Sequence, residues 1–122
     1  MNAEELKQRT QEFSLRIIKL VSALPTGLVA QVLGRQVLKS GTSLGANYRE
    51  ALRATSRADF IAKIKIAERE IDETVYWLEL IEASGLLPSR KLSALYAEAR
   101  ELSAIFAAIA KTTRRRAANC KL

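Results

Sequence analysis

The chain has 122 residues, which is enough for one domain with a hydrophobic core but too few for two domains. It contains no histidine and a single cysteine, which excludes an internal disulfide, a Glu-x-x-His di-iron site and imidazole-dependent hydrolytic or ribonuclease chemistry. The net charge is +7, and residues 111–122 carry five of these positive charges with no acid among them.

The composition favours an all-helical protein that lies outside the membrane. Only 5 glycines and 2 prolines interrupt a sequence dominated by good helix formers. No run of about 18 apolar residues could span a membrane. The N-terminus is charged and lacks the apolar region of a signal peptide, so we expect a cytoplasmic protein.

The first helix is predicted over residues 3–23. Its apolar positions alternate in steps of four and three, which is typical of a bundle helix, at Leu6, Thr10, Phe13, Ile17, Leu20 and Leu24. Pro25 and Gly27 end it, because proline disfavours helix at the preceding residue and glycine opens the turn.

The second helix, predicted over residues 28–54, carries polar residues inside its apolar face. At about 100° per residue, one arc collects Leu33, Gln36, Ser40, Ser43, Leu44, Asn47 and Ala51. An unpaired buried amide costs roughly 1–3 kcal/mol, so the polar members of this arc need partners. We therefore expect a structural polar network, in preference to a ligand site, formed by Gln36, Ser40, Ser43, Asn47 and either Glu73 or Glu70 of the third helix.

Two further helices are predicted after residue 56. The third begins after Ser56, whose side chain can cap it, and ends at Gly85, with Leu86 placed for the accompanying apolar contact. Its core register is Phe60, Ile64, Ala67, Ile71, Thr74, Leu78 and Ile81. The fourth is capped by Ser89, extends to about residue 113, and has the register Leu92, Leu95, Ala99, Leu102, Phe106 and Ile109.

Short links between long helices make sequential neighbours antiparallel, which predicts an all-α, up-down-up-down four-helix bundle over residues 1–113. Residues 114–122 are predicted to form a basic C-terminal tail. Arg114, Arg115 and Arg116 cannot share one helical face, so they should radiate or fray instead of joining the core.

A second apolar arc on the middle helices suggests self-association. Tyr48 flanks the main face of the second helix, and Trp77 lies away from the core register of the third. Contact with both adjacent helices of the same bundle accounts for part of this width. Because large aromatic side chains are favoured at subunit interfaces, we nevertheless predict an oligomer interface that includes Tyr48 and Trp77.

The second helix also carries a basic stripe, formed by Arg35, Lys39, Arg49 and Arg53, which fall within about 80° of one another. We expect this stripe and the cations Lys111, Arg114, Arg115 and Arg116 to contact nucleic-acid phosphates. The alternative is a solvated face without a ligand. Aromatic interleaving is absent, so binding would be directed at the backbone.

No catalytic, cofactor or metal site is expected. The acids Glu68, Glu70, Asp72 and Glu73 point in different directions at helical spacing, so a solvated acidic patch is favoured over a metal cluster. The sequence thus predicts a non-enzymatic, oligomeric nucleic-acid-binding subunit, with a protein-interaction scaffold as the alternative.

The pattern of residues along the first three helices resembles the four helix bundle protein family. The resemblance lies in the segment Ser43-x-x-Asn47-x-x-Glu50, with Leu24-Pro25, Gln36, Ser40, Arg53, Ser56, Phe60, Ile66-Ala67, Glu73 and Gly85-Leu86 around it. The chain departs from the usual pattern at Ala51, where glycine is common, and at Glu70, where a small serine is usual.

That family includes proteins encoded in intervening sequences of bacterial 23S ribosomal RNA genes and the accessory variability determinant of diversity-generating retroelements. The resemblance implies a homopentameric barrel of bundles with a basic surface. In the retroelement branch it also implies binding to a reverse transcriptase and to RNA or DNA. The number five and the reverse transcriptase come from the resemblance alone.

Overall fold

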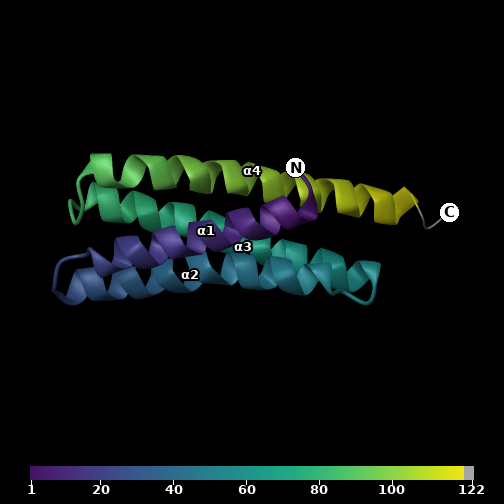
Figure 1. Ribbon diagram of the computed structural model, residues 1–122, viewed down its shortest axis with the longest axis horizontal. Helices are drawn as coiled ribbons and strands as arrows, with labels where there is room; N and C mark the ends of the chain where they lie inside the picture. Colours follow the sequence, from purple (N-terminus) through teal and green to yellow (C-terminus); the bar gives the residue numbers. More distant parts are fainter. Residues whose placement is uncertain (120–122) are drawn as a thin grey trace.

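The computed structural model describes residues 1–119, and within this range it contains four helices and no strand. They are α1 (Ala3–Ser22), α2 (Leu28–Leu52), α3 (Arg57–Ala83) and α4 (Ser89–Asn119). Each helix packs against its sequence neighbour, and α1 also contacts α4, which closes the bundle. Figure 1 shows the alternating directions, with the α1–α2 and α3–α4 links at one end and the α2–α3 link at the other. The predicted antiparallel four-helix bundle is confirmed.

The predicted ends of α3 are confirmed by its hydrogen bonds. The Ser56 side chain accepts from the backbone N–H of Asp59 at 3.0 Å, which satisfies a donor of the first turn. At the other end Gly85 has a φ of +77°, and the Leu86 N–H donates to the carbonyl of Ile81 at 3.2 Å. Glycine adopts this left-handed conformation without a Cβ penalty, so Gly85 is the residue that lets the chain reverse toward α4.

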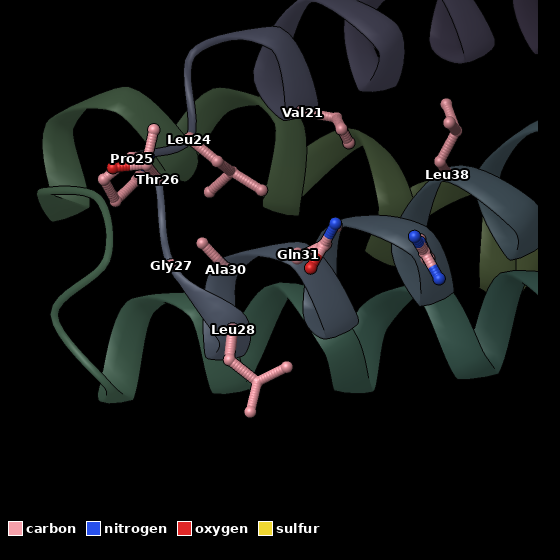
Figure 2. Close-up of a pocket in the computed structure, with 11 residues that line it drawn as sticks. Val21, Leu24, Pro25, Thr26, Gly27, Leu28, Ala30, Gln31 and Leu38 are labelled. Atoms are coloured by element: carbon pink, nitrogen blue, oxygen red, sulfur yellow. The ribbon is translucent and has the colours of Figure 1, made fainter.

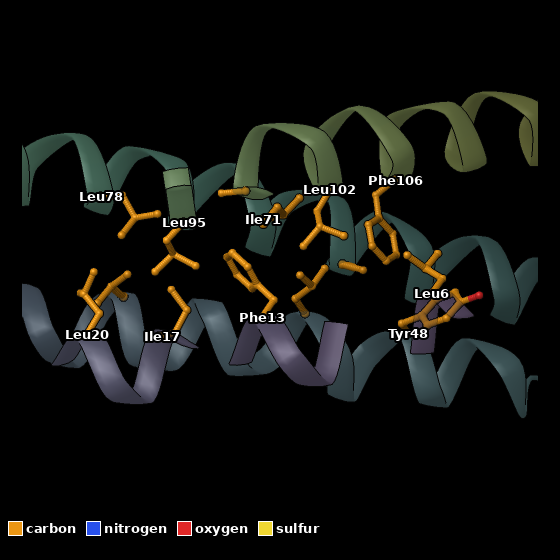
Figure 3. Close-up of a cluster of buried hydrophobic side chains, with 14 of the residues drawn as sticks. Leu6, Phe13, Ile17, Leu20, Tyr48, Ile71, Leu78, Leu95, Leu102 and Phe106 are labelled. Carbon is orange, nitrogen blue, oxygen red and sulfur yellow. The ribbon is translucent and has the colours of Figure 1, made fainter. Parts of the chain in front are cut away.

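The core registers predicted for α1, α3 and α4 match the observed burial closely. Figure 3 shows side chains from these helices and α2 meeting along the bundle axis. Five of the six positions predicted in α1 are buried, and the sixth, Leu24, is half-buried. Phe60 of α3 and Ile109 of α4 are also half-buried, at the ends of their registers. Ala110 joins the core in addition.

The face predicted for α2 is only partly correct: Ser40, Leu44 and Ala51 are buried, whereas Gln36 is exposed and the other three predicted positions are half-buried. Its buried positions are Ala30, Gly34, Val37, Ser40, Gly41, Leu44, Gly45, Tyr48 and Ala51. This face is rotated by roughly 80° about the helix axis from the predicted arc. Three of the nine buried residues are glycines, which carry no hydrophobic side chain, so their burial leaves no apolar signal in the sequence.

These glycines let α1 approach α2 closely. A Cβ atom built on Gly41 would lie 2.8 Å from Cγ1 of Ile17, and one on Gly45 would lie 3.3 Å from the hydroxyl oxygen of Thr10. The close approach also lets the Ser14 hydroxyl reach the carbonyl of Gly41 at 3.0 Å. At these two glycines, side chains of α1 therefore pack directly against the backbone of α2.

A charged pair holds α1 to α4. The Arg9 guanidinium donates from Nε and Nη2 to the two carboxylate oxygens of Glu98 at 2.7 and 2.6 Å, and Glu101 lies 3.1 Å away. This two-pronged arrangement fixes direction as well as distance. The hydrogen bonds that Arg9 donates to Glu98 raise the pKa of Arg9 above its ordinary value, so the guanidinium stays charged.

The last helix continues further than the sequence predicted. α4 ends at Asn119 and not near residue 113, and its C-terminal end extends past the other helices in Figure 1. Arg114, Arg115 and Arg116 are therefore helical, and they are exposed, as expected for residues outside the core. The part of the predicted tail from Cys120 onward, including Lys121, lies outside the described residues.

Candidate nucleic-acid interface

The basic stripe of α2 lies on the outside of the bundle. Arg35, Lys39, Arg49 and Arg53 are all exposed, on the side of α2 opposite its core face. Arg49 is held by a hydrogen bond from Nη2 to the amide oxygen of Gln11 on α1, at 3.0 Å. That bond spans the two helices, so the outer surface of α1 belongs to the same candidate interface.

Packing adds a cation that the sequence analysis did not identify. Lys7 of α1 lines a small pocket of about 160 Å³ together with Arg49 and Leu52 of α2 and with Arg53, the residue that follows this helix. We call Lys7, Arg49 and Arg53 the three-cation cluster. No acidic side chain lines this pocket. A short turn between antiparallel helices places the start of the first helix beside the end of the second. The short link at residues 23–27 could therefore have identified Lys7 as a neighbour of Arg49 and Arg53 from the sequence.

The other half of the stripe is separate from the cluster. Arg35 lies fourteen residues before Arg49, about 21 Å along the helix axis. It lines an apolar groove at the opposite end of α1 and α2. Lys39 lies between them along the helix. The four cations thus do not form one continuous site.

The C-terminal cations form a second basic region. Lys111, Arg114, Arg115 and Arg116 are exposed on the last turns of α4. Arg116 lines a shallow groove of about 370 Å³ with Phe60, Ile109 and Thr113. The region lies on α4, whereas the three-cation cluster lies on α1 and α2. Repeated cations on a helix attract phosphates without reading base sequence.

The predicted polar network is only partly formed. Ser40 is buried, and its hydroxyl is 2.8 Å from that of Thr74, which also donates to the carbonyl of Glu70 at 2.8 Å. Asn47 is half-buried and donates from Nδ2 to the carbonyl of Ser43 at 2.9 Å. The Ser43 side chain makes no hydrogen bond within residues 1–119.

Gln36 and Glu73 are exposed, and their predicted places in the network are wrong. The physical reason is the rotation of α2 described above, which turns Gln36 toward solvent and brings Ser40 to Thr74. Glu70 is half-buried, and its burial raises its pKa, with a smaller contribution in the same direction from the charge of Glu73. Glu70 reaches the network only through its backbone carbonyl.

The two aromatic residues predicted at an oligomer interface differ in how far the single chain buries them. The predicted interface position of Tyr48 is wrong. Its side chain is 4% exposed within the single chain and packs edge-on against Phe106, with ring centroids 5.5 Å apart. Tyr48 is therefore buried by other residues of the bundle core (Figure 3). Trp77 is half-buried, and its indole N–H is the one buried side-chain polar atom without a hydrogen-bond partner within residues 1–119.

The described residues contain neither a metal-binding cluster nor a membrane-spanning helix. Within residues 1–119 no group of three or more Cys, Asp or Glu side chains could hold a metal ion. None of the four helices, over that same range, combines the length and the apolar character needed to cross a bilayer.

The fold and its surface define a class: a four-helix bundle with exposed basic regions on its surface. The chain belongs to the 23S rRNA-intervening sequence protein family, which it matches over residues 3–108.

One solved structure supports this assignment at the level of the whole fold. It is the crystal structure, at 1.70 Å, of a protein of unknown function from the S23 ribosomal protein family of Bacteroides thetaiotaomicron VPI-5482. The two sequences are 37% identical, and the match covers 91% of this chain and 99% of the other with a TM-score of 0.80. None of the curated proteins compared with the chain matches it.

Proposed function

We propose that this protein is a non-enzymatic, oligomeric accessory subunit that binds nucleic acid through its phosphates. The observation that carries the proposal is the three-cation cluster of Lys7, Arg49 and Arg53, which two helices bring together without an acidic neighbour in the pocket. The exposed cations of α4 add a second positive region. Guanidinium groups match phosphate oxygens in geometry as well as charge.

The family's description associates its members with ribosomal RNA genes, which makes RNA the first nucleic acid to test. A reverse transcriptase is a further possible partner, and this part of the proposal rests on the resemblance to the retroelement branch. The polar groups of the protein support backbone contacts only, since exposed aromatic side chains for base stacking are absent from the cluster.

The test is the salt dependence of binding to single-stranded RNA. Each phosphate neutralised contributes about −0.7 to the slope of log K against log salt concentration. Substituting Lys7, Arg49 and Arg53 by glutamine should flatten the slope by up to about 2 and weaken binding at low salt by tenfold or more. Deleting residues 114–122 should flatten it by about 2–3, because the deletion removes four cations, Arg114, Arg115, Arg116 and Lys121.

A matched control removes three exposed cations elsewhere: Lys65, Arg69 and Arg90 to glutamine. This variant has the same net charge as the cluster variant and should keep most of the affinity. If both variants lost the same amount of RNA affinity, binding would depend on net charge alone and not on the three-cation cluster. If the wild-type protein bound no RNA or DNA even at low salt, the protein-interaction scaffold would replace the nucleic-acid proposal.

The proposal includes self-association through the apolar surface of α1 and α2. Leu28, Val29 and Val32 are 75%, 57% and 49% exposed, and Leu15 and Ile18 of α1 are exposed as well. Beside them lies a groove of about 660 Å³ between the end of α1 and the start of α2. In Figure 2, Leu24 and Ala30 point toward one another across this groove, and Leu28 is also among the residues that line it. Exposed apolar area of this kind is typical of surfaces covered by another subunit.

Light scattering coupled to gel filtration should therefore return a multiple of the 13.5 kDa chain mass, and the resemblance predicts five. Val32→Asp should reduce the mass toward that of the monomer while leaving the helicity unchanged, because Val32 lies outside the core. Lys65→Asp on the outer face of α3 is the control. A 13.5 kDa species for the wild type at micromolar concentration would refute the association, whereas a closed ring of another size would refute only the number.

A further inference from the structure

A groove separate from both basic regions runs between α1 and α4. It has a volume of about 390 Å³, within the range of small-ligand pockets. The residues that line it come from the second half of α1, the α3–α4 link and the start of α4: Arg16, Lys19, Leu20, Ala23, Leu87, Lys91, Ala94 and Leu95.

The charge of this groove is positive on both sides. Arg16 and Lys19 belong to α1 and Lys91 to α4, and no acidic side chain lines the groove. None of the three forms an ion pair within the described part of the chain, in contrast to Arg9 on the same seam. The N-terminal end of α4 adds the partial positive charge of a helix dipole beside Lys91. The groove is therefore suited to an anionic group.

The floor is aliphatic. Leu20, Leu87 and Leu95 are largely buried, and only a small part of each side chain faces the groove. Ala23 and Ala94 are exposed at the opening, and their small side chains do not block it. No aromatic ring lines the groove, so it offers no surface on which a nucleic-acid base could stack. The complement to this floor is a short aliphatic chain.

The length of the groove limits its ligand. From Arg16 to Ala23 it extends about 10 Å along α1, which matches an extended chain of roughly eight carbon atoms. Beyond it, the Arg9–Glu98 pair occupies the same seam. A docked helix is about 10–12 Å wide and would not fit within this volume.

We propose that the α1–α4 groove binds a small aliphatic anion, with its head between the cations and its chain over the leucine floor. The head can be a carboxylate or a phosphate, since both accept hydrogen bonds from arginine and lysine. This site is independent of the proposed nucleic-acid function, because it shares no residue with the three-cation cluster or the α4 cations.

The test is a titration followed by two-dimensional ¹⁵N–¹H NMR on the full-length chain, with each amphiphile below its micelle-forming concentration. Octanoate and octyl phosphate should shift the amide signals of residues 16–23 and 87–95, and their relative affinity identifies the preferred head. Octylammonium and acetate should shift them far less. Equal binding of octylammonium would overturn the role of charge, and equal binding of acetate would overturn the role of the chain.

Variants locate the site. Arg16→Gln with Lys91→Gln should weaken octanoate binding about tenfold, which corresponds to the loss of two exposed ion pairs. Lys65→Gln with Arg69→Gln, which makes the same change in net charge on the outer face of α3, should leave it unchanged. Ala94→Leu should also weaken binding, because it fills the groove from an exposed helix position. Wild-type affinity in both groove variants would overturn the proposal.

Discussion

Gly41→Val should unfold this protein at a denaturant concentration well below that of the wild type, with a loss of more than about 3 kcal/mol in the free energy of unfolding. Even the first added carbon has no room. A Cβ on Gly41 would lie 2.8, 3.0 and 3.3 Å from three carbon atoms of Ile17, including the Cβ of that side chain. Ile17 is fully buried and β-branched, so it cannot rotate away.

Gly41→Ala separates this clash from helix propensity. Alanine is favoured over glycine in a helix by about 1 kcal/mol, so a position with free space would gain stability. At Gly41 we expect a net loss of about 1–3 kcal/mol instead. Urea unfolding followed by circular dichroism measures the difference.

Gly34→Ala is the matched control on the same helix. Its nearest contact is Cδ1 of Leu24 at 3.1 Å, the end of a half-buried side chain that can move. This variant should be neutral or more stable by up to about 1 kcal/mol. Ile17→Ala removes both Cγ atoms that the new Cβ would meet, so Ile17→Ala and Gly41→Ala together should cost less than the sum of their separate losses. Equal stability of Gly41→Ala and Gly34→Ala would contradict the close helix contact.

Phe106→Ala should cost about 3–5 kcal/mol, because it leaves a cavity beside the Tyr48 ring in the fully buried centre of α4. A bundle of this size has a total stability of about 5–15 kcal/mol, so the variant should be largely unfolded by moderate heating. Thermal unfolding followed by circular dichroism is the measurement.

Two substitutions of Tyr48, the aromatic neighbour of Phe106, provide the comparison for that experiment. Tyr48→Ala should be destabilised by a similar amount, whereas Tyr48→Phe should lie within about 0.5 kcal/mol of the wild type, since the Tyr48 hydroxyl makes no hydrogen bond within residues 1–119. Figure 3 shows that hydroxyl at the edge of the cluster. A fall in oligomer mass for Tyr48→Phe without a change in stability would restore Tyr48 to the interface.

Several parts of the structure followed from the sequence alone. The registers of α1, α3 and α4 were predictable because their buried positions are occupied by large apolar side chains at helical spacing, as from Ile64 to Ile81. The cap at Ser56 and the turn at Gly85 were predictable because each depends on local chemistry within a few residues. The exposure of the basic stripe followed from charge alone.

Other features were decided by tertiary packing. Hydrophobicity indicated only part of the face of α2, because Gly34, Gly41 and Gly45 are buried by the approach of α1 and contribute no apolar side chain. Because the observed core face differs from the predicted one by this rotation, Tyr48 lies in the core and Gln36 is exposed to solvent. Lys7 joined Arg49 and Arg53, forty or more residues away, only because α1 and α2 pack side by side. The sequence determines which residues are charged, apolar or small, whereas the distance between helix backbones decides which of them meet.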